Sequence, residues 1–327
     1  MNSQNTVNRI EYIDTAKAIA ILSVIVGHCY WIKSIPYGID VIYSFHMSLF
    51  FIVSGYFSKP LLLKDAIIKF LKAYIKPLAF TVVIALILVI IGDLIRGESI
   101  IETTKEWCKL LFYMYGDQEP INIPRITPLW FLYALFASSV IFSYLLHKFD
   151  SHNLLIAVFG LLFLGLFIRH FRLLPLTVCE SMVAVAFLMV GRFINECKIL
   201  TENKITKLNW IIICFVWLCS IPLGTFFFKT LTFGKTFITV LGSIAATLAV
   251  FQICKLSKIK LRWIGRNTLP ILCGHVLSFN VLKIVGFNYD QLTLHPIGNF
   301  VIEIGCQITL ALLIAFVLTL TPIYKKK

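Results

Sequence analysis

Ten apolar stretches, each close to the length of a membrane-spanning helix, constrain this chain more than any other feature of its sequence. A helix needs roughly 20 predominantly apolar residues to cross the hydrocarbon core of a bilayer. With 59% hydrophobic and 14% charged residues, the chain has more apolar side chain than one soluble core can enclose. The sequence therefore predicts an all-α, polytopic integral membrane protein with about ten transmembrane helices. The stretches are approximately 16–33, 39–58, 77–96, 128–147, 153–170, 173–194, 209–228, 235–254, 268–287 and 296–320.

The distribution of Lys and Arg predicts the orientation of these helices. With a cytoplasmic N-terminus, 20 of the 30 basic residues fall in cytoplasmic segments, a bias that favours both termini in the cytoplasm. Most of the net charge of +14 then lies in a cytoplasmic girdle of Lys and Arg residues. Topology and contact with anionic membrane lipids explain such a girdle, so it does not indicate nucleic acid as a partner. A phosphate-rich cytosolic ligand is the alternative explanation.

The chain shows no cleavable signal, internal repeat or linker, so residues 1–327 are expected to form a single membrane domain without a separate soluble domain. Its nine cysteines are scattered singly, without a C-x-x-C pair. This usage is typical of small core residues and indicates neither redox chemistry nor a metal site. We expect no bound metal or cofactor.

Lys17 and His28 stand at the two ends of the apolar stretch KAIAILSVIVGH. Ionisable residues inside a bilayer are energetically expensive and are therefore candidates for function. Eleven residues of helix place these two only about 20° apart around the helix and roughly 16 Å apart along it. Asp14 falls on nearly the same stripe. One helix would thus link a cation at the cytoplasmic boundary to a buried imidazole, unless Lys17 merely extends its ammonium to the lipid headgroups.

Four ionisable side chains are expected at a similar depth in the outer half of the membrane: His28, His46, Glu180 and Glu303. Each of the last three lies about seven residues, or roughly 10 Å, inside its apolar stretch. A histidine beside a carboxylate has a fixed tautomer and a raised basicity, which suits a general base. The structural alternative for each of the four is a hydrogen bond between neighbouring helices.

Two further motifs carry candidate binding residues. Trp130, in TPLWFLYAL, could offer its indole face to a sugar ring or belong to the interfacial aromatic belt. In IGRNTLPILCGH, Arg266 and Asn267 lead into a helix whose N-terminus would suit an anion. His275 closes this motif and is expected near the inner side of the membrane, away from the other buried ionisable groups.

These motifs together resemble the acyltransferase 3 family of membrane-bound acyltransferases. The segments IDTAKAIAILSVIVGH, FHMSLFFIVSGYF, PLWFL and GRNTLPILCGH occur in the order and spacing of that family over essentially the whole chain. The resemblance is greatest to its fucose 4-O-acetylase-like, or polysaccharide O-acetyltransferase, group. Two positions depart from the family pattern: Lys17 stands where many members carry Arg, and Ser48 stands where a proline is usual. Lys lacks the bidentate fork of Arg.

The resemblance implies an enzyme with about ten membrane spans that takes an acyl group, usually acetyl, from cytosolic acetyl-CoA as co-substrate. It would deliver the group to a hydroxyl of a cell-surface or lipid-linked glycan. The family's basic residue and histidine, separated by ten residues, fall on Lys17 and His28, and His28 takes the catalytic role. The histidine of the family's second span falls on His46.

The residue patterns and the resemblance together predict a multi-pass O-acetyltransferase of the bacterial cytoplasmic membrane. Direct transfer and an acetyl-histidine intermediate both remain open, as does the identity of the acceptor. A secondary transporter or flippase for a glycan or small polar solute is the alternative, although the two halves show no pair of corresponding broken stretches. The predicted catalytic residues are His28, His46 and Glu180, and the predicted substrate-binding residues are Lys17, Asp14, Trp130, Arg266, Asn267, His275 and Glu303.

Overall fold

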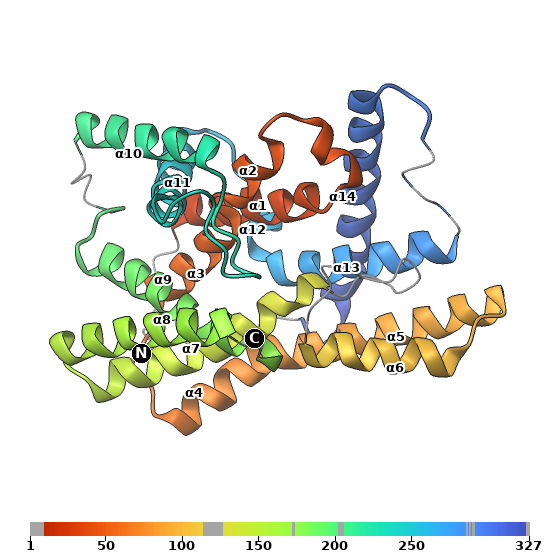
Figure 1. The fold of residues 1–327 in the computed structure, drawn as a ribbon, viewed down its shortest axis with the longest axis horizontal. Coiled ribbons are helices and arrows are strands. Elements are labelled where there is room, and N and C mark those ends of the chain that lie inside the picture. Colours follow the sequence, from red (N-terminus) through yellow and green to blue (C-terminus); the bar gives the residue numbers. More distant parts are fainter. Residues whose placement is uncertain are drawn as a thin grey trace, which may run out of the picture.

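The computed structural model describes residues 10–113, 127–171, 174–201, 206–285, 287, 289 and 292–324. These residues form helices and no strand, apart from one isolated bridge between Phe227 and Thr232, which confirms the predicted all-α class. Figure 1 shows α14 passing α13, and α5 and α6 lying side by side. The α-helices are α1 (Glu11–Gly27), α2 (Gly38–Tyr43), α3 (His46–Tyr56), α4 (Leu63–Phe70), α5 (Lys76–Arg96), α6 (Ile100–Tyr113), α7 (Trp130–Lys148), α8 (Ser151–Phe171), α9 (Val178–Glu196), α10 (Lys207–Ser220), α11 (Ile238–Leu256), α12 (Arg262–Arg266), α13 (Thr268–Ile284) and α14 (Pro296–Leu320). Short helical turns of other types are η1 (Tyr30–Ser34), η2 (Leu71–Ile75), η3 (Thr127–Leu129), η4 (Pro175–Thr177) and η5 (Ile221–Leu223).

Among the described residues, seven helical stretches are long and apolar enough to cross a membrane. The other three predicted stretches hold shorter helices: α1 with 17 residues, α10 with 14 and α13 with 17. The chain is thus a multi-pass membrane protein, whereas the count of ten spans and the cytoplasmic placing of both termini stay predictions. The seven stretches are Gly38–Tyr56, Leu63–Arg96, Trp130–Lys148, Ser151–Phe171, Pro175–Glu196, Ile238–Leu256 and Pro296–Leu320.

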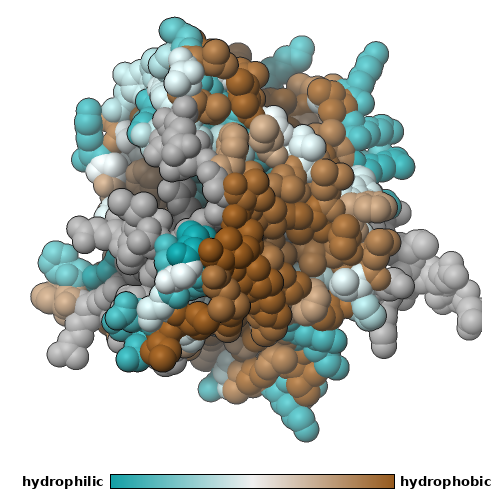
Figure 2. All heavy atoms as spheres, turned by 90° about the vertical axis from the view of Figure 1, so that its right-hand side faces the viewer, coloured by the Kyte–Doolittle hydropathy of each residue, from teal (hydrophilic) through white to brown (hydrophobic). Residues whose placement is uncertain are grey.

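The outward-facing surface of the bundle carries many large apolar side chains. On α8, Phe159, Phe163 and Phe167 follow one another at four-residue spacing and are each more than half exposed. Figure 2 shows a broad apolar surface across the middle of one face, with hydrophilic residues gathered at its upper and lower margins. An apolar surface of this extent suits the hydrocarbon of a bilayer rather than water.

Helix α1 lies inside the bundle, where it contacts α3, α11, α12 and α13. Its small residues Ala16, Ala18 and Ala20 are completely buried. Small side chains allow neighbouring membrane helices to approach closely, because they add little bulk between the backbones. The helix that carries Lys17 and His28 is therefore surrounded by other helices.

Two glycines fix the crossing of α3 and α9. A Cβ atom on Gly55 would lie 1.9 Å from the carbonyl oxygen of Leu188, and one on Gly191 would lie 1.9 Å from the carbonyl oxygen of Ile52. No larger residue fits at either position without moving a backbone. The close crossing holds α3 in place, and α3 begins at His46.

The second predicted stretch, 39–58, is broken rather than continuous. Phe45 adopts a non-helical conformation with φ −131° and ψ −32°, which separates α2 from α3. In α3, the Ser48 hydroxyl, at the position where the resemblance leads us to expect proline, lies 3.2 Å from the Thr247 hydroxyl on α11. The break places His46 at the first turn of a new helix instead of the middle of a long one.

The seventh predicted stretch, 209–228, is wrong beyond Ser220. Helix α10 ends there, and η5 and a loop carry the chain to α11. Pro222 has no backbone N–H to continue a helix, and Gly224 has a φ of 85°, which side-chain-bearing residues rarely adopt. The chain consequently turns back toward the bundle at this point. Helix α6 lies between the third and fourth predicted stretches, outside all ten of them.

Candidate active site

A cavity of about 600 Å³, partly open to the outside of the protein, lies among α1, α3, α7, α13 and the loop between η5 and α11. Lys17 and His28 both line this cavity, and Ile21 and Val24 line it between them. The structure therefore places Lys17 and His28, the two ends of the predicted stripe of α1, on the wall of one cavity. Apolar side chains make up most of the remaining wall.

Lys17 is held by a carboxylate at its end of the cavity. The Lys17 ammonium lies 2.7 Å from Asp14, three residues earlier on α1. Asp14 is only 5% exposed, and its second carboxylate oxygen lies 3.7 Å from Nε of Arg266 on α12. The buried carboxylate of Asp14 thus joins Lys17 and Arg266, two predicted substrate-binding cations that lie far apart in the sequence.

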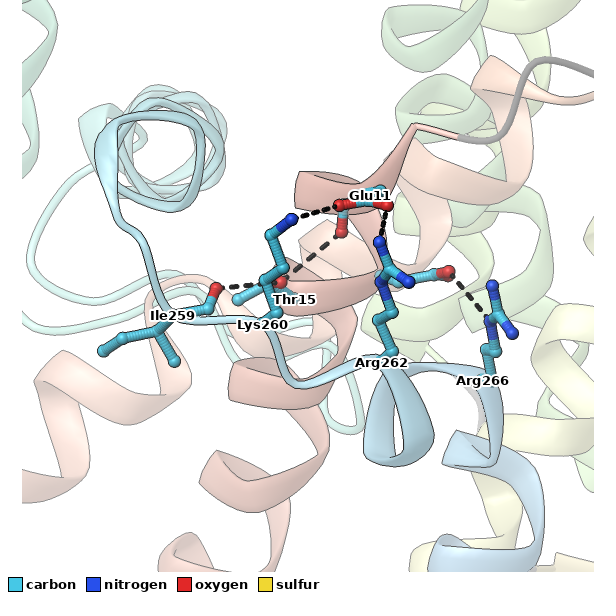
Figure 3. A network of polar contacts seen from close by, with 7 residues as sticks. Glu11, Thr15, Ile259, Lys260, Arg262 and Arg266 are labelled. Atoms are coloured by element: carbon cyan, nitrogen blue, oxygen red, sulfur yellow. Dashed lines mark hydrogen bonds and ion pairs between the residues drawn. The ribbon is translucent and has the colours of Figure 1, made fainter.

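A second set of ion pairs ties the start of α1 to the segment before α13 (Figure 3). Glu11 pairs with Lys260 at 3.1 Å and also with Arg262, while the Thr15 hydroxyl donates to the carbonyl oxygen of Ile259. The side chains of Lys260 and Arg262 remain 63% and 48% exposed. The Lys17 end of the cavity is therefore next to solvent-accessible cations, which is an arrangement suited to an anionic group.

Gly265 allows α12 to lie directly against α1. A Cβ atom at this position would lie 1.8 Å from the carbonyl oxygen of Asp14. Asn267 follows α12 and donates its side-chain amide to the carbonyl oxygen of Trp263 at 2.8 Å, while the next residue, Thr268, lines the cavity. Asn267 thus closes α12 immediately before the chain enters α13.

His28 ends α1 and packs against another histidine. Its ring centroid lies 5.6 Å from that of His275 on α13, and His275 is completely buried. The sequence placed His275 near the inner side of the membrane, apart from the other buried ionisable groups. The structure instead brings His275 into contact with His28, because the middle of α13 crosses the end of α1.

His46 lines the same cavity from the first turn of α3 and is 3% exposed. Its Nδ1 lies 2.6 Å from the carbonyl oxygen of Ile42. Because a carbonyl oxygen only accepts hydrogen bonds, Nδ1 of His46 carries the ring proton. Nε2 is then the nitrogen that can accept a hydrogen bond. The rings of Tyr43 and His46 are nearly perpendicular, with centroids 4.8 Å apart, and the Tyr43 hydroxyl donates to the carbonyl oxygen of Gly27. Tyr43 therefore connects His46 with the residue before His28.

Trp130 begins α7 and lines the cavity together with Pro128. The indole is 7% exposed and its edge meets the ring of Phe131. This position inside the protein differs from that of an interfacial belt residue that faces lipid. A flat aromatic wall of this kind can pack against the C–H face of a sugar.

The two predicted carboxylates, Glu180 and Glu303, are not among the described residues that line the cavity. Glu180 lies at the start of α9, 3.8 Å from Nε of Arg169 on α8. Glu303 accepts hydrogen bonds from the backbone N–H groups of Tyr30 at 2.6 Å and Trp31 at 2.9 Å. Glu303 therefore holds the turn that follows His28.

The sequence did not predict the contribution of the loop between η5 and α11. Four of its residues, Phe227 to Thr230, line the cavity. The available signals were Pro222 and Gly224, which interrupt an apolar stretch, and Lys229, a charged residue that directly follows three phenylalanines. Within the parts of the chain that the structure describes, no cluster of three or more His, Cys, Asp or Glu side chains could hold a metal ion.

Comparison with known proteins gives one match, at the level of the family. No curated protein and no solved structure matches the chain. The model of the acyltransferase 3 family, described as an acyltransferase domain, matches residues 10–321, which is nearly the whole chain. The chain therefore belongs to the acyltransferase 3 family.

Proposed function

We propose that the protein transfers an acyl group, acetyl by preference, from acetyl-CoA to a hydroxyl of a cell-surface or lipid-linked glycan, in the cytoplasmic membrane of a bacterium. One observation carries the proposal. A single cavity is lined by a lysine at one end and by two histidines farther along α1 and α3. Such a cavity offers a cation to an anionic donor at one end and imidazole groups to an acceptor hydroxyl farther along.

The donor would enter at the Lys17 end. The phosphates of acetyl-CoA carry several negative charges, and Lys17, Arg266 and the exposed Lys260 and Arg262 supply positive charge there. Asp14 fixes the direction of the Lys17 ammonium by its 2.7 Å contact. The long, flexible arm of the donor would then lie along the apolar wall of α1 and carry its thioester toward His28.

The acceptor would enter from the His28 end and pack its sugar ring on Trp130, which lines the same cavity. The unprotonated ring nitrogen of a neutral His28 would remove the proton from the acceptor hydroxyl as the hydroxyl oxygen attacks the thioester carbonyl carbon. The carbon–sulfur bond then breaks, and the imidazolium returns its proton to the departing thiolate. In the covalent variant, a ring nitrogen of His28 attacks the thioester carbon, the carbon–sulfur bond breaks, and the thiolate takes the proton from the other ring nitrogen. The acceptor hydroxyl oxygen then attacks the acetyl carbon, and the hydroxyl proton passes to the imidazole as the carbon–nitrogen bond breaks. His275 and His46 would position the imidazole and the acceptor.

The test uses purified protein in lipid nanodiscs with radiolabelled acetyl-CoA and a surface-glycan fraction as acceptor. We expect label to appear on the glycan, His28→Ala to abolish transfer, and Lys17→Ala to raise the KM for acetyl-CoA. His152→Ala is the matched control, because His152 is exposed on α8. Full transfer by a folded His28→Ala variant would contradict the catalytic assignment. Glycan movement across the bilayer without acetyl-CoA would favour transport instead.

A further inference from the structure

A π-helical turn brings a tyrosine to the wall of the cavity. Helix α4 passes into η2, whose residues Leu71–Ile75 form a π-helix, and α5 follows directly. Turns of this kind are rare and occur frequently at functional sites. Of these described residues, Tyr74 is the one that lines the cavity. The irregular turn between α4 and α5 thus adds a phenolic hydroxyl to a site that the sequence assigned to other residues.

A small apolar cluster holds the Tyr74 ring in place. The ring stacks on that of Phe70, with the two planes 1° apart and the centroids separated by 5.9 Å. Phe70 is buried together with Ala66 on α4 and Val140 on α7, and Tyr74 packs against the same cluster. The position of the Tyr74 hydroxyl is therefore set by the packing of α4 and η2 on α7.

Ser54 on α3 places a second hydroxyl beside that of Tyr74. Ser54 also lines the cavity, and its side chain is a hydrogen-bonding neighbour of the Tyr74 hydroxyl. Each hydroxyl can donate one hydrogen bond and accept others, so two hydroxyls that bond to each other can still bond to a ligand. Phe50 and Val53, which line the cavity from the same helix, are apolar. Ser54 and Tyr74 therefore form a neutral polar patch on a mostly apolar wall.

The end of α3 lies beside the start of α1. The hydroxyl of Tyr12, in the first turn of α1, donates to the carbonyl oxygen of Leu200 at 3.0 Å. The side-chain amide of Asn195 donates to the carbonyl oxygen of Tyr56, the last residue of α3, at 2.8 Å. Both contacts are made by one short segment at and after the end of α9. Helix α3 therefore runs in the direction opposite to α1.

The hydroxyl pair accordingly belongs to the end of the cavity to which the proposed function assigns the donor. Ser54 lies in the last turn of α3, and Lys17 lies in the second turn of α1. Beyond its phosphates, the donor has a flexible arm that contains amide groups. An amide that enters a mostly apolar space requires a hydrogen-bonding partner, because it loses its bonds to water. Neutral hydroxyls suit an amide, whereas the cations near Asp14 suit phosphate.

We infer that Tyr74 and Ser54 bind an amide group of the acetyl-CoA arm, so that the enzyme recognises its donor by the arm as well as by the phosphates. The inference rests on the proposed function, because it assigns further residues to the donor of that reaction. The two hydroxyls would fix how far the arm enters the cavity and thereby hold the thioester at the depth of His28. Loss of one such hydrogen bond weakens binding by about two- to tenfold.

The test measures binding by isothermal titration calorimetry in nanodiscs, so that it does not depend on turnover. The probes are coenzyme A and adenosine 3′,5′-bisphosphate, which has the nucleotide end of the donor without the arm. Tyr74→Phe keeps the stacked ring, and we expect it to weaken the binding of coenzyme A by about threefold or more. Ser54→Ala should act in the same way, and both variants should bind the bisphosphate as the unmodified protein does. Tyr144→Phe, on α7 outside the described cavity lining, is the matched control and should change neither affinity.

Two results would overturn the inference: an unchanged affinity of folded Tyr74→Phe for coenzyme A, or an equal loss in Tyr144→Phe. An equal loss of affinity for both probes would also overturn it, since the hydroxyls would then serve the phosphates rather than the arm. The two proposals can fail separately. Binding of coenzyme A that depends on Tyr74, without any acetyl transfer, would contradict the proposed function alone. Acetyl transfer to glycan by protein whose affinity for coenzyme A is the same with and without the Tyr74 hydroxyl would contradict only the role of Tyr74.

Discussion

The carboxylate of Asp14 lies 2.7 Å from the ammonium of Lys17, one turn apart on α1, and the same carboxylate reaches Arg266 on α12 at 3.7 Å. Asp14 is 5% exposed, whereas the side chains of Lys17 and Arg266 are 22% and 45% exposed. The buried anion therefore fixes two cations that retain access to solvent. This relationship makes the first turns of α1 and α12 one unit at the proposed donor entrance.

Asp14→Asn should weaken both donor binding and stability. Breaking a buried ion pair from one side costs about 3–5 kcal/mol, and the partial exposure of Lys17 reduces this to about 1–2 kcal/mol of unfolding free energy. Because Lys17 also loses its fixed direction, we expect the KM for acetyl-CoA to rise about tenfold with a smaller change in kcat. Thermal unfolding in nanodiscs and steady-state kinetics would measure the two effects.

The control for this variant is Glu196→Gln, which breaks the exposed ion pair with Arg192 on α9. Exposed pairs four residues apart on a helix contribute about 0.3–0.5 kcal/mol, so this change should leave the KM unaltered. An Asp14→Asn protein with unchanged Tm and KM would show that Asp14 does not organise the entrance.

Gly265→Ala should separate α12 from α1. Its new methyl group would lie 1.8 Å from the carbonyl oxygen of Asp14, and a backbone atom cannot move aside as a flexible side chain can. Overpacking of this kind costs about 1–3 kcal/mol. We expect a lower Tm and a raised KM for acetyl-CoA, because Arg262 and Arg266 would move away from the cavity.

Gly160→Ala on α8 is the matched control, since no heavy atom lies within 4 Å of the added Cβ position. Alanine favours the helix there by about 1 kcal/mol relative to glycine. The control should keep or raise the Tm. If Gly265→Ala behaved in the same way, the close approach of α12 to α1 would be disproved.

His275→Ala should lower the rate of transfer without changing the affinity for either substrate. The His275 ring packs 5.6 Å from that of His28, so its loss allows the catalytic imidazole to tilt. Ring pairs of this kind contribute about 0.5–1.5 kcal/mol, which corresponds to a decrease in kcat of up to about tenfold. The pH dependence of kcat should also shift, which a purely structural role for His275 would not produce. His275→Phe keeps the ring and should restore part of kcat.

The periodicity of the sequence was sufficient to predict the features that lie on a single helix. The stripe from Lys17 to His28 follows from 3.6 residues per turn, and the apolar stretches predicted the long helices because lipid requires continuous apolar segments. Both inferences depend on local geometry alone. The structure adds that Lys17, Ile21, Val24 and His28 of this stripe line one cavity between helices.

The relationships between helices could not be predicted in the same way. Depth along a span says at which level a residue lies but not toward which neighbour it points. His275 was therefore placed apart from His28, although the crossing of α13 and α1 brings their rings together. Glu180 and Glu303 were grouped with the histidines by depth, yet they face Arg169 and the backbone of η1. The loop between η5 and α11 was missed because its aromatic residues, Phe226 to Phe228, extend the apolar pattern of α10.

Glu303→Gln tests whether this carboxylate acts on substrate or only on structure. In the structure Glu303 accepts two charge-assisted hydrogen bonds, from the N–H groups of Tyr30 and Trp31, and is 1% exposed. A glutamine keeps one acceptor oxygen but directs its amide N–H₂ at the other donor, which leaves a buried N–H without an acceptor and costs about 1–3 kcal/mol. We expect a Tm lowered by several degrees, with the KM for acetyl-CoA and the affinity for the acceptor unchanged at a temperature where the variant is folded. An acceptor affinity weakened tenfold or more in the folded variant would return Glu303 to the substrate-binding role that its depth in the sequence predicted.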